Sequence, residues 1–241
     1  MTKQTIDPWE KLQRRIVGCN RCPRLREHCG VMATVKRAAF RDQAYWGKPV
    51  PNFGDRAARL VILGLAPAAH GANRTGRMFT GDRSGDFLYR AMHEAGFANQ
   101  PTALHADDGL ELRDAMITAS AHCAPPDNKP TPAELTECFA HLRATVELLP
   151  NLRGFLALGR IAFDELMRLY RYREWLTAGA KPKFAHGALH RFSGAPFILC
   201  SYHPSQQNTF TGRLTPQMMR DVFQTAKEAL GAPATPVARG R

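Results

Sequence analysis

The chain has 241 residues, of which 44% are hydrophobic, enough for one ordinary globular domain with its own core. No apolar run approaches the roughly 20 residues of a membrane-spanning helix, and the N-terminus lacks the apolar centre of a signal peptide, so we expect a cytoplasmic protein without membrane association. Lys and Arg outnumber Asp and Glu by 33 to 21, and the resulting net charge of +12 favours a polyanionic partner such as nucleic acid.

Hydrophobic runs alternate with helical patterns along most of the chain, and short helices are expected around a Cys-x-x-Cys pair within residues 8–40. This alternation predicts an α/β fold, a single-domain three-layer α/β/α arrangement around a mostly parallel four-stranded sheet. The domain would span residues 1–230, with a disordered tail at 231–241. The expected strands are Leu60–Leu63, Ala115–Ala121, Gly154–Leu158 and Pro196–Ser201, and the expected helices are Gly85–Ala95, Thr131–Leu149, Arg160–Trp175 and Pro216–Leu230.

Three polar loops follow predicted strands and should meet at the carboxyl edge of the sheet, where open α/β folds bind ligands. They are residues 64–84, 122–130 and 202–215. The first is rich in glycine, and we expect Ser84 to cap the helix after it. It matches neither a P-loop nor a dinucleotide fingerprint, which excludes both phosphate-binding motifs.

Six cysteines in a cytoplasmic chain favour metal or redox chemistry over disulfides. Cys19 and Cys22 form a close pair, and Cys123 and Cys138 follow about a hundred residues later. Four thiolates suit either zinc or an iron–sulfur cluster, and the spacing alone leaves both open, as well as buried free cysteines.

Three segments in order, GLAPAAHG…NRTGRMFTGD, CAPPDNKPTP and HPSQQNTFTGRLT, resemble the uracil-DNA glycosylase superfamily, and most closely its family 5. The resemblance covers roughly residues 15–230. It implies a structural 4Fe–4S cluster on Cys19, Cys22, Cys123 and Cys138. Cys29 is a rival ligand, and Cys200 should be a buried small hydrophobic residue.

The resemblance also implies a mechanism in which a nucleotide is extruded from the DNA stack into a pocket. Phe79 would stack on the flipped base, with simple packing under the loop as the alternative. His203 would donate a hydrogen bond to the base. Asp82 and Asn128 would stabilise the sugar cation and orient a water. Asp82 could equally be a loop-capping residue, and Asp86 is a rival to it on chemistry alone.

Two departures from the superfamily's patterns bear on substrate choice. Leu65 and Ala66 stand where other families carry a carboxylate or amide, and Ala119 stands where most families place an asparagine that reads uracil. Because a methyl group does not reject other bases as an unpaired amide would, we expect a broader range that includes hypoxanthine.

Further side chains are expected around the pocket and on DNA. Gln206 and Gln207 would fill the vacated stack, and His70 and Asn73 would line the pocket. The expected phosphate contacts are Arg74, Arg77, Arg83 and Arg213.

The function implied is a monofunctional, monomeric, nucleoid-associated DNA repair glycosylase, which removes deaminated bases from double- or single-stranded DNA. One alternative is an iron–sulfur protein that binds DNA or a nucleotide without turnover. Another is a hydrolase of free nucleotides, with which the charge of +12 conflicts.

Overall fold

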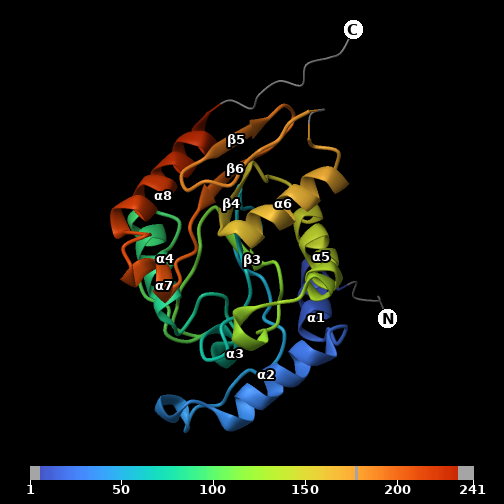
Figure 1. Cartoon of the computed structure of the whole chain (residues 1–241), viewed down its shortest axis with the longest axis vertical. Coiled ribbons are helices and arrows are strands. Elements are labelled where there is room, and N and C mark those ends of the chain that lie inside the picture. Colours follow the sequence, from blue (N-terminus) through green and yellow to red (C-terminus); the bar gives the residue numbers. More distant parts are fainter. Residues whose placement is uncertain (1–5, 177–178, 233–241) are drawn as a thin grey trace.

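A six-stranded sheet in the order β1-β3-β2-β4-β6-β5 forms the centre of the computed structural model, which describes residues 6–176 and 179–232 (Figure 1). The four central strands β3, β2, β4 and β6 are parallel, as predicted, whereas β1 and β5 add antiparallel edges. The prediction of four strands was therefore two short. The strands are β1 Phe53–Gly54, β2 Leu60–Gly64, β3 Ala115–Ala119, β4 Gly154–Leu158, β5 Leu189–Phe192 and β6 Ala195–Ser201.

Helices cover both faces of the sheet, which confirms the three-layer prediction. In Figure 1, α4 and α8 lie on one side of the strands and α5 and α6 on the other, while α2 lies at the lower end. The helices are α1 Pro8–Val17, α2 Pro23–Val35, α3 Ala72–Thr75, α4 Arg83–Glu94, α5 Pro132–Glu147, α6 Arg160–Tyr172, α7 Gln206–Phe210 and α8 Pro216–Gly231, with 3₁₀ turns η1 Ala38–Phe40 and η2 Pro126–Asn128.

The strand β2 shows why two cores form. Successive side chains of a strand point to opposite faces. Leu60 and Ile62 accordingly join the core beneath α4 and α8, and Val61 and Leu63 join the core beneath α1, α5 and α6. A strand buried on both faces needs a continuous apolar run, which is the pattern that predicted it.

Helix starts agree with the sequence at α5 and differ at α4. Thr131 caps α5 in a complete capping box with Glu134. At α4 the cap is Asp82, not Ser84, and its Oδ1 accepts a hydrogen bond from the Gly85 amide at 2.9 Å. The helix therefore begins two residues earlier than predicted, and its cap is one of the predicted site residues.

The predicted tail lies outside the described residues from position 233 onward, and Gly231 ends α8. None of the helices in the described ranges has both the length and the apolar character needed to cross a bilayer.

Candidate active site

The three polar loops meet around a cavity of about 550 Å³ at the carboxyl ends of β2, β3 and β6. This position follows from the topology, because parallel strands bring the loops after them to one edge. Six predicted residues line the cavity together with Gln206 and Gln207 of α7. They are Ala66, Phe79, Asp82, Ala119, Asn128 and His203.

Phe79 stands in the cavity wall with a left-handed backbone, φ 52°, which is uncommon for a non-glycine residue. Its ring lies 5.9 Å from the His203 ring, centroid to centroid, at an interplanar angle of 31°. A Cβ on Gly64 would approach the Phe79 ring to 3.0 Å, so glycine at the end of β2 leaves room for the aromatic. Phe79 is half-buried and one side of it borders the open cavity.

His203 follows β6 and reaches the cavity from the loop before α7. Burial lowers the pKa of its imidazole to about 4, because desolvation disfavours the charged form. The ring is therefore neutral near pH 7 and carries one N–H donor. Asn208 Nδ2 donates to the His203 carbonyl at 2.8 Å and so connects this residue to α7.

Asp82 combines a structural bond with a place in the cavity. While its Oδ1 caps α4, its Oδ2 lies against Gly71, where an added Cβ would come within 2.0 Å of that oxygen. Burial raises the pKa of the Asp82 carboxyl above its ordinary value. Its rival Asp86 is exposed on α4 and borders a different hollow, beside Arg83 and Arg90.

Asn128 lies at the mouth of the cavity on η2. Both Asp127, with φ 53°, and Asn128, with φ 56°, occupy the left-handed region. Each such residue costs on the order of 1 kcal/mol, less for Asn and Asp than for other side chains. Strained backbone of this kind must be held by its surroundings, and it is concentrated at functional sites.

Arg74 and Arg77, which were predicted to contact phosphates, are buried and bond to other groups of the protein. Arg77 is 5% exposed, and its guanidinium donates to both oxygens of Asp108 at 2.8 Å. Arg74 is 8% exposed and donates to the His70 carbonyl and to Gln43. Their burial contradicts a role in binding phosphate.

His70 and Asn73 do not line the cavity. The Nδ1 atom of His70 is 3.1 Å from the Tyr45 hydroxyl, and His70 is not among the residues that line the cavity. Asn73 is fully buried, and its Nδ2 donates to the carbonyl groups of Cys29 and Ala69. The prediction that these two residues line the pocket is wrong, because their side chains contact neighbouring segments instead.

The surface beside the cavity carries the remaining predicted residues. Gln206 and Gln207 are exposed, as are Arg83 and Arg213. The Arg213 guanidinium lies 4.6 Å from the Tyr202 ring centroid. Sequence reasoning missed Asp127, Ser84 and Ser205, which also line the cavity. Asp127 was signalled only by its place next to Asn128.

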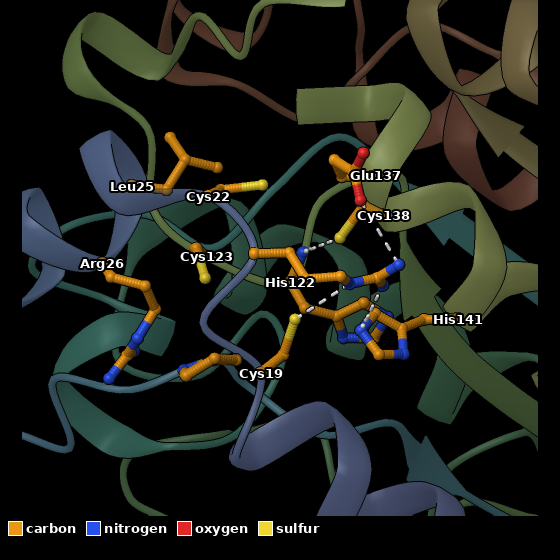
Figure 2. Close-up of a pocket in the computed structure, with 11 residues that line it drawn as sticks. Cys19, Cys22, Leu25, Arg26, His122, Cys123, Glu137, Cys138 and His141 are labelled. Carbon is orange, nitrogen blue, oxygen red and sulfur yellow. Dashed lines mark hydrogen bonds and ion pairs between the residues drawn. The ribbon is translucent and has the colours of Figure 1, made fainter. Parts of the chain in front are cut away.

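A second, smaller cavity is lined by four cysteines brought together from three segments (Figure 2). The Arg21 Nε donates to Cys19 Sγ at 3.5 Å, and the His122 amide donates to Cys138 Sγ at 3.3 Å. Across the residues that the structure describes, no three His, Cys, Asp or Glu side chains are close enough to hold one metal ion. The four are Cys19, Cys22, Cys123 and Cys138.

The two other cysteines do not line this cavity. Cys29 is buried beside Cys123, and its Sγ donates to the Ala124 carbonyl at 3.8 Å. Cys200 is fully buried in the core beneath α5 and α6, as predicted. Burial raises the pKa of the Cys138 thiol to about 12, so a nearby cation is needed to keep it as a thiolate.

Comparison with known proteins settles the family. The sequence model of the uracil DNA glycosylase superfamily matches residues 51–227. This chain belongs to the uracil-DNA glycosylase superfamily. It is similar to proteins named type-5 uracil-DNA glycosylase from Mycobacterium leprae (50% identical over 92% of this chain and 95% of the relative) and Thermus thermophilus (46%, over 92% and 98%). A relative of the same name from Pyrobaculum aerophilum is 39% identical over 90% of this chain and 91% of its own length.

This uracil-DNA glycosylase superfamily member has an apolar wall on one side of its cavity. Leu65 and Ala66 follow β2, and Ala119, at 3% exposure, ends β3. These positions present no side-chain donor or acceptor to a base. The polar groups of the cavity come from the other walls, at Asp82, Asn128 and His203.

Proposed function

We propose that this chain is a monofunctional DNA glycosylase that extrudes uracil from DNA and hydrolyses its N-glycosidic bond, leaving an abasic site. One observation carries the proposal. In a member of this superfamily, Phe79, Asp82, Asn128 and His203 line a single cavity. An aromatic surface, a neutral donor, a carboxylate and an amide are the groups that such a reaction requires.

The base side of the cavity serves binding and leaving-group stabilisation. Stacking on Phe79 returns on the order of 1–3 kcal/mol of the cost of extrusion. As the bond lengthens, negative charge collects on the base, and the neutral imidazole of His203 donates to its carbonyl oxygen. Because the pKa of the imidazolium is lowered to about 4, that acidic form is essentially absent at neutral pH, and His203 has no acidic proton to transfer. His203 therefore acts through a hydrogen bond.

The sugar side uses Asp82 and Asn128. The transition state resembles an oxocarbenium ion, which a carboxylate stabilises by its charge. The raised pKa of Asp82 brings this carboxylate closer to the range suited to accepting a proton from water. The exposed amide of Asn128 at the cavity mouth suits orientation of that water. Asp86 is not assigned this role, because it borders another hollow.

Double- or single-stranded DNA with deaminated bases is the proposed partner of the monomer, and the net charge of +12 supports it. Gln206 and Gln207 would enter the space that the flipped nucleotide leaves. Arg83 and Arg213, both exposed, would contact phosphates. The apolar wall at Ala119 supports a range that includes hypoxanthine, because no buried amide there is left unpaired by a purine.

The four cysteines of the second cavity fit a 4Fe–4S cluster. The donors are thiols, and N–H groups of Arg21 and His122 point at two of the sulfurs. Cys123 and Cys138 are buried, whereas Cys19 and Cys22 are half-buried. When bound, the cluster would supply a cross-link between segments and no chemistry on the substrate. Iron and sulfide analysis tests this, and Cys138→Ser should lose iron that Cys29→Ser and Cys200→Ser retain. Iron loss in Cys29→Ser with retention in Cys138→Ser would reverse the ligand assignment.

The deciding experiment uses a duplex with one uracil and reads alkali-labile abasic sites. The wild-type protein should cleave, while Asp82→Asn and Asn128→Ala should be slower by at least about tenfold each and keep their iron. Binding to the duplex without cleavage by the wild type would favour the non-catalytic alternative. Turnover of free nucleotides with no dependence on salt would favour the nucleotide hydrolase.

A further inference from the structure

The strained turn that carries Asn128 is attached to the cysteine-bearing N-terminal segment by one side chain. Arg24 lies on α2, two residues after Cys22, more than a hundred residues away from the turn in sequence. Its Nη2 atom donates to the Lys129 carbonyl at 3.2 Å. Lys129 directly follows Asn128, so this bond holds the backbone next to the catalytic amide.

The same guanidinium also grips the start of α5. Arg24 Nε donates to Glu134 Oε1 at 2.8 Å, and Nη2 donates to Oε2 at 2.7 Å. Glu134 is 7% exposed, and its Oε2 also accepts the Thr131 amide at 2.7 Å. The planar guanidinium of Arg24 therefore connects the Lys129 carbonyl to the Glu134 carboxylate in the first turn of α5. A lysine ammonium cannot reproduce this two-pronged geometry.

The segment that carries Asn128 lies between two of the cysteines that line the second cavity. Cys123 begins the loop before η2, and Cys138 lies in the second turn of α5 (Figure 2). The turn at Asp127 and Asn128 has left-handed backbone at both residues. Two backbone bonds within the loop close it, Asn128 N to the Pro125 carbonyl and Lys129 N to the Pro126 carbonyl. From outside the loop, Cys29 Sγ donates to the Ala124 carbonyl near its start, and Arg24 donates to the Lys129 carbonyl beside Asn128.

We propose that Arg24 is a positioning residue for the glycosidic reaction, which holds the carbonyl after Asn128 and the cap of α5 so that the Asn128 amide stays at the cavity mouth. It does not line the cavity and acts at a distance, through the Lys129 carbonyl and the Glu134 side chain. The inference rests on the proposed role of Asn128, and it assigns a function to the arginine that follows the Cys-x-x-Cys pair.

The test compares Arg24→Lys with a matched control. Arg24→Lys keeps the charge and leaves the Thr131–Glu134 capping box intact, so the fold should be retained. On uracil-containing DNA its kcat should fall about tenfold with KM within about twofold, because the amide is misplaced only at the chemical step. Arg59 forms an equally bidentate pair with Asp114 at the amino ends of β2 and β3, away from the cavity. Both arginine side chains are 44% exposed. Arg59→Lys should leave kcat unchanged.

Two further measurements separate positioning from a general structural role. In an Asn128→Ala background, adding Arg24→Lys should cost no further rate, because the side chain it positions is gone. Amide hydrogen exchange at Asn128 and Lys129 should quicken in Arg24→Lys while exchange in α5 does not. Glu134→Gln, which keeps an acceptor for Thr131, should show the same pattern more weakly.

Several outcomes would overturn the inference. These are an unchanged kcat in Arg24→Lys, a full multiplicative loss in the double variant, or loss of iron from Arg24→Lys, which would move the effect to the metal centre. Failure of the proposed function looks different. In that case the wild-type protein itself does not cleave uracil-containing DNA, and no comparison among variants is needed.

Discussion

Gly71→Ala should inactivate the protein by displacing the Asp82 carboxylate, without replacing any catalytic residue. The added Cβ would lie 2.0 Å from Asp82 Oδ2 and 2.8 Å from its Cγ, where real Cβ contacts are not found below 3.0 Å. The carboxylate must therefore move by about 1 Å, and a displacement of that size at a reacting group costs on the order of a hundredfold in rate.

The same movement strains the cap of α4. Oδ1 of Asp82 accepts the Gly85 amide, and weakening an N-cap costs about 1 kcal/mol, or roughly 2–4 °C in the melting temperature for a chain of this size. The assay is single-turnover cleavage of a uracil-containing duplex, with melting followed in parallel.

Gly30→Ala is the control, because a Cβ there meets nothing within 4 Å and the position is helical. It should keep full activity and gain up to about 1 kcal/mol of stability. A Gly71→Ala protein that melts normally and cleaves within about threefold of the wild-type rate would refute the placement of Asp82 in the chemical step.

Three more outcomes follow from the same geometry. Burial lowers the pKa of His203 from about 6.5 to about 4, so the imidazole stays neutral as the pH falls through 6. Any change in kcat/KM that depends on His203 should therefore be centred near pH 4, and a His203-dependent change centred near 6.5 would contradict this. Arg77→Gln leaves Asp108 buried without its partner and should cost about 3–5 kcal/mol of stability, while the salt dependence of DNA binding stays unchanged. Arg213→Gln should have normal stability, but the slope of log binding constant against log salt concentration should fall by about one unit. Ala119→Asn should shift preference toward uracil and away from hypoxanthine, and equal ratios of the two cleavage rates before and after the change would show that Ala119 does not set the substrate range.

The parallel core of the sheet could be predicted because its strands are continuous apolar runs. Leu60–Leu63 and Gly154–Leu158 are buried on both faces, and that burial leaves a pattern visible in one sequence. The edge strands leave no such pattern. β1 has two residues, and β5, with His190 and Arg191, is half-exposed and mixes polar with apolar side chains.

The convergence of the loops was predictable for a topological reason, but the fate of single arginines was not. Residues after parallel strands meet at one edge whatever their identity, and so Phe79, Asn128 and His203 line one cavity. Whether a guanidinium faces solvent depends on distant partners. Arg77 is neutralised by Asp108, 31 residues further along the chain, and no local pattern signals that pair.

The short antiparallel borders of the sheet have a consequence for solubility. The four inner strands are the kind of uncharged apolar segment that templates intermolecular β-pairing when left open. On one flank the edge strand β1 is two residues long. On the other flank the register of β5 shifts between His190 and Phe192. Neither border offers an incoming chain a long, regular ladder. Removing residues 189–192 would expose the Ala195–Ser201 strand and should make the protein precipitate during refolding more readily than the wild type.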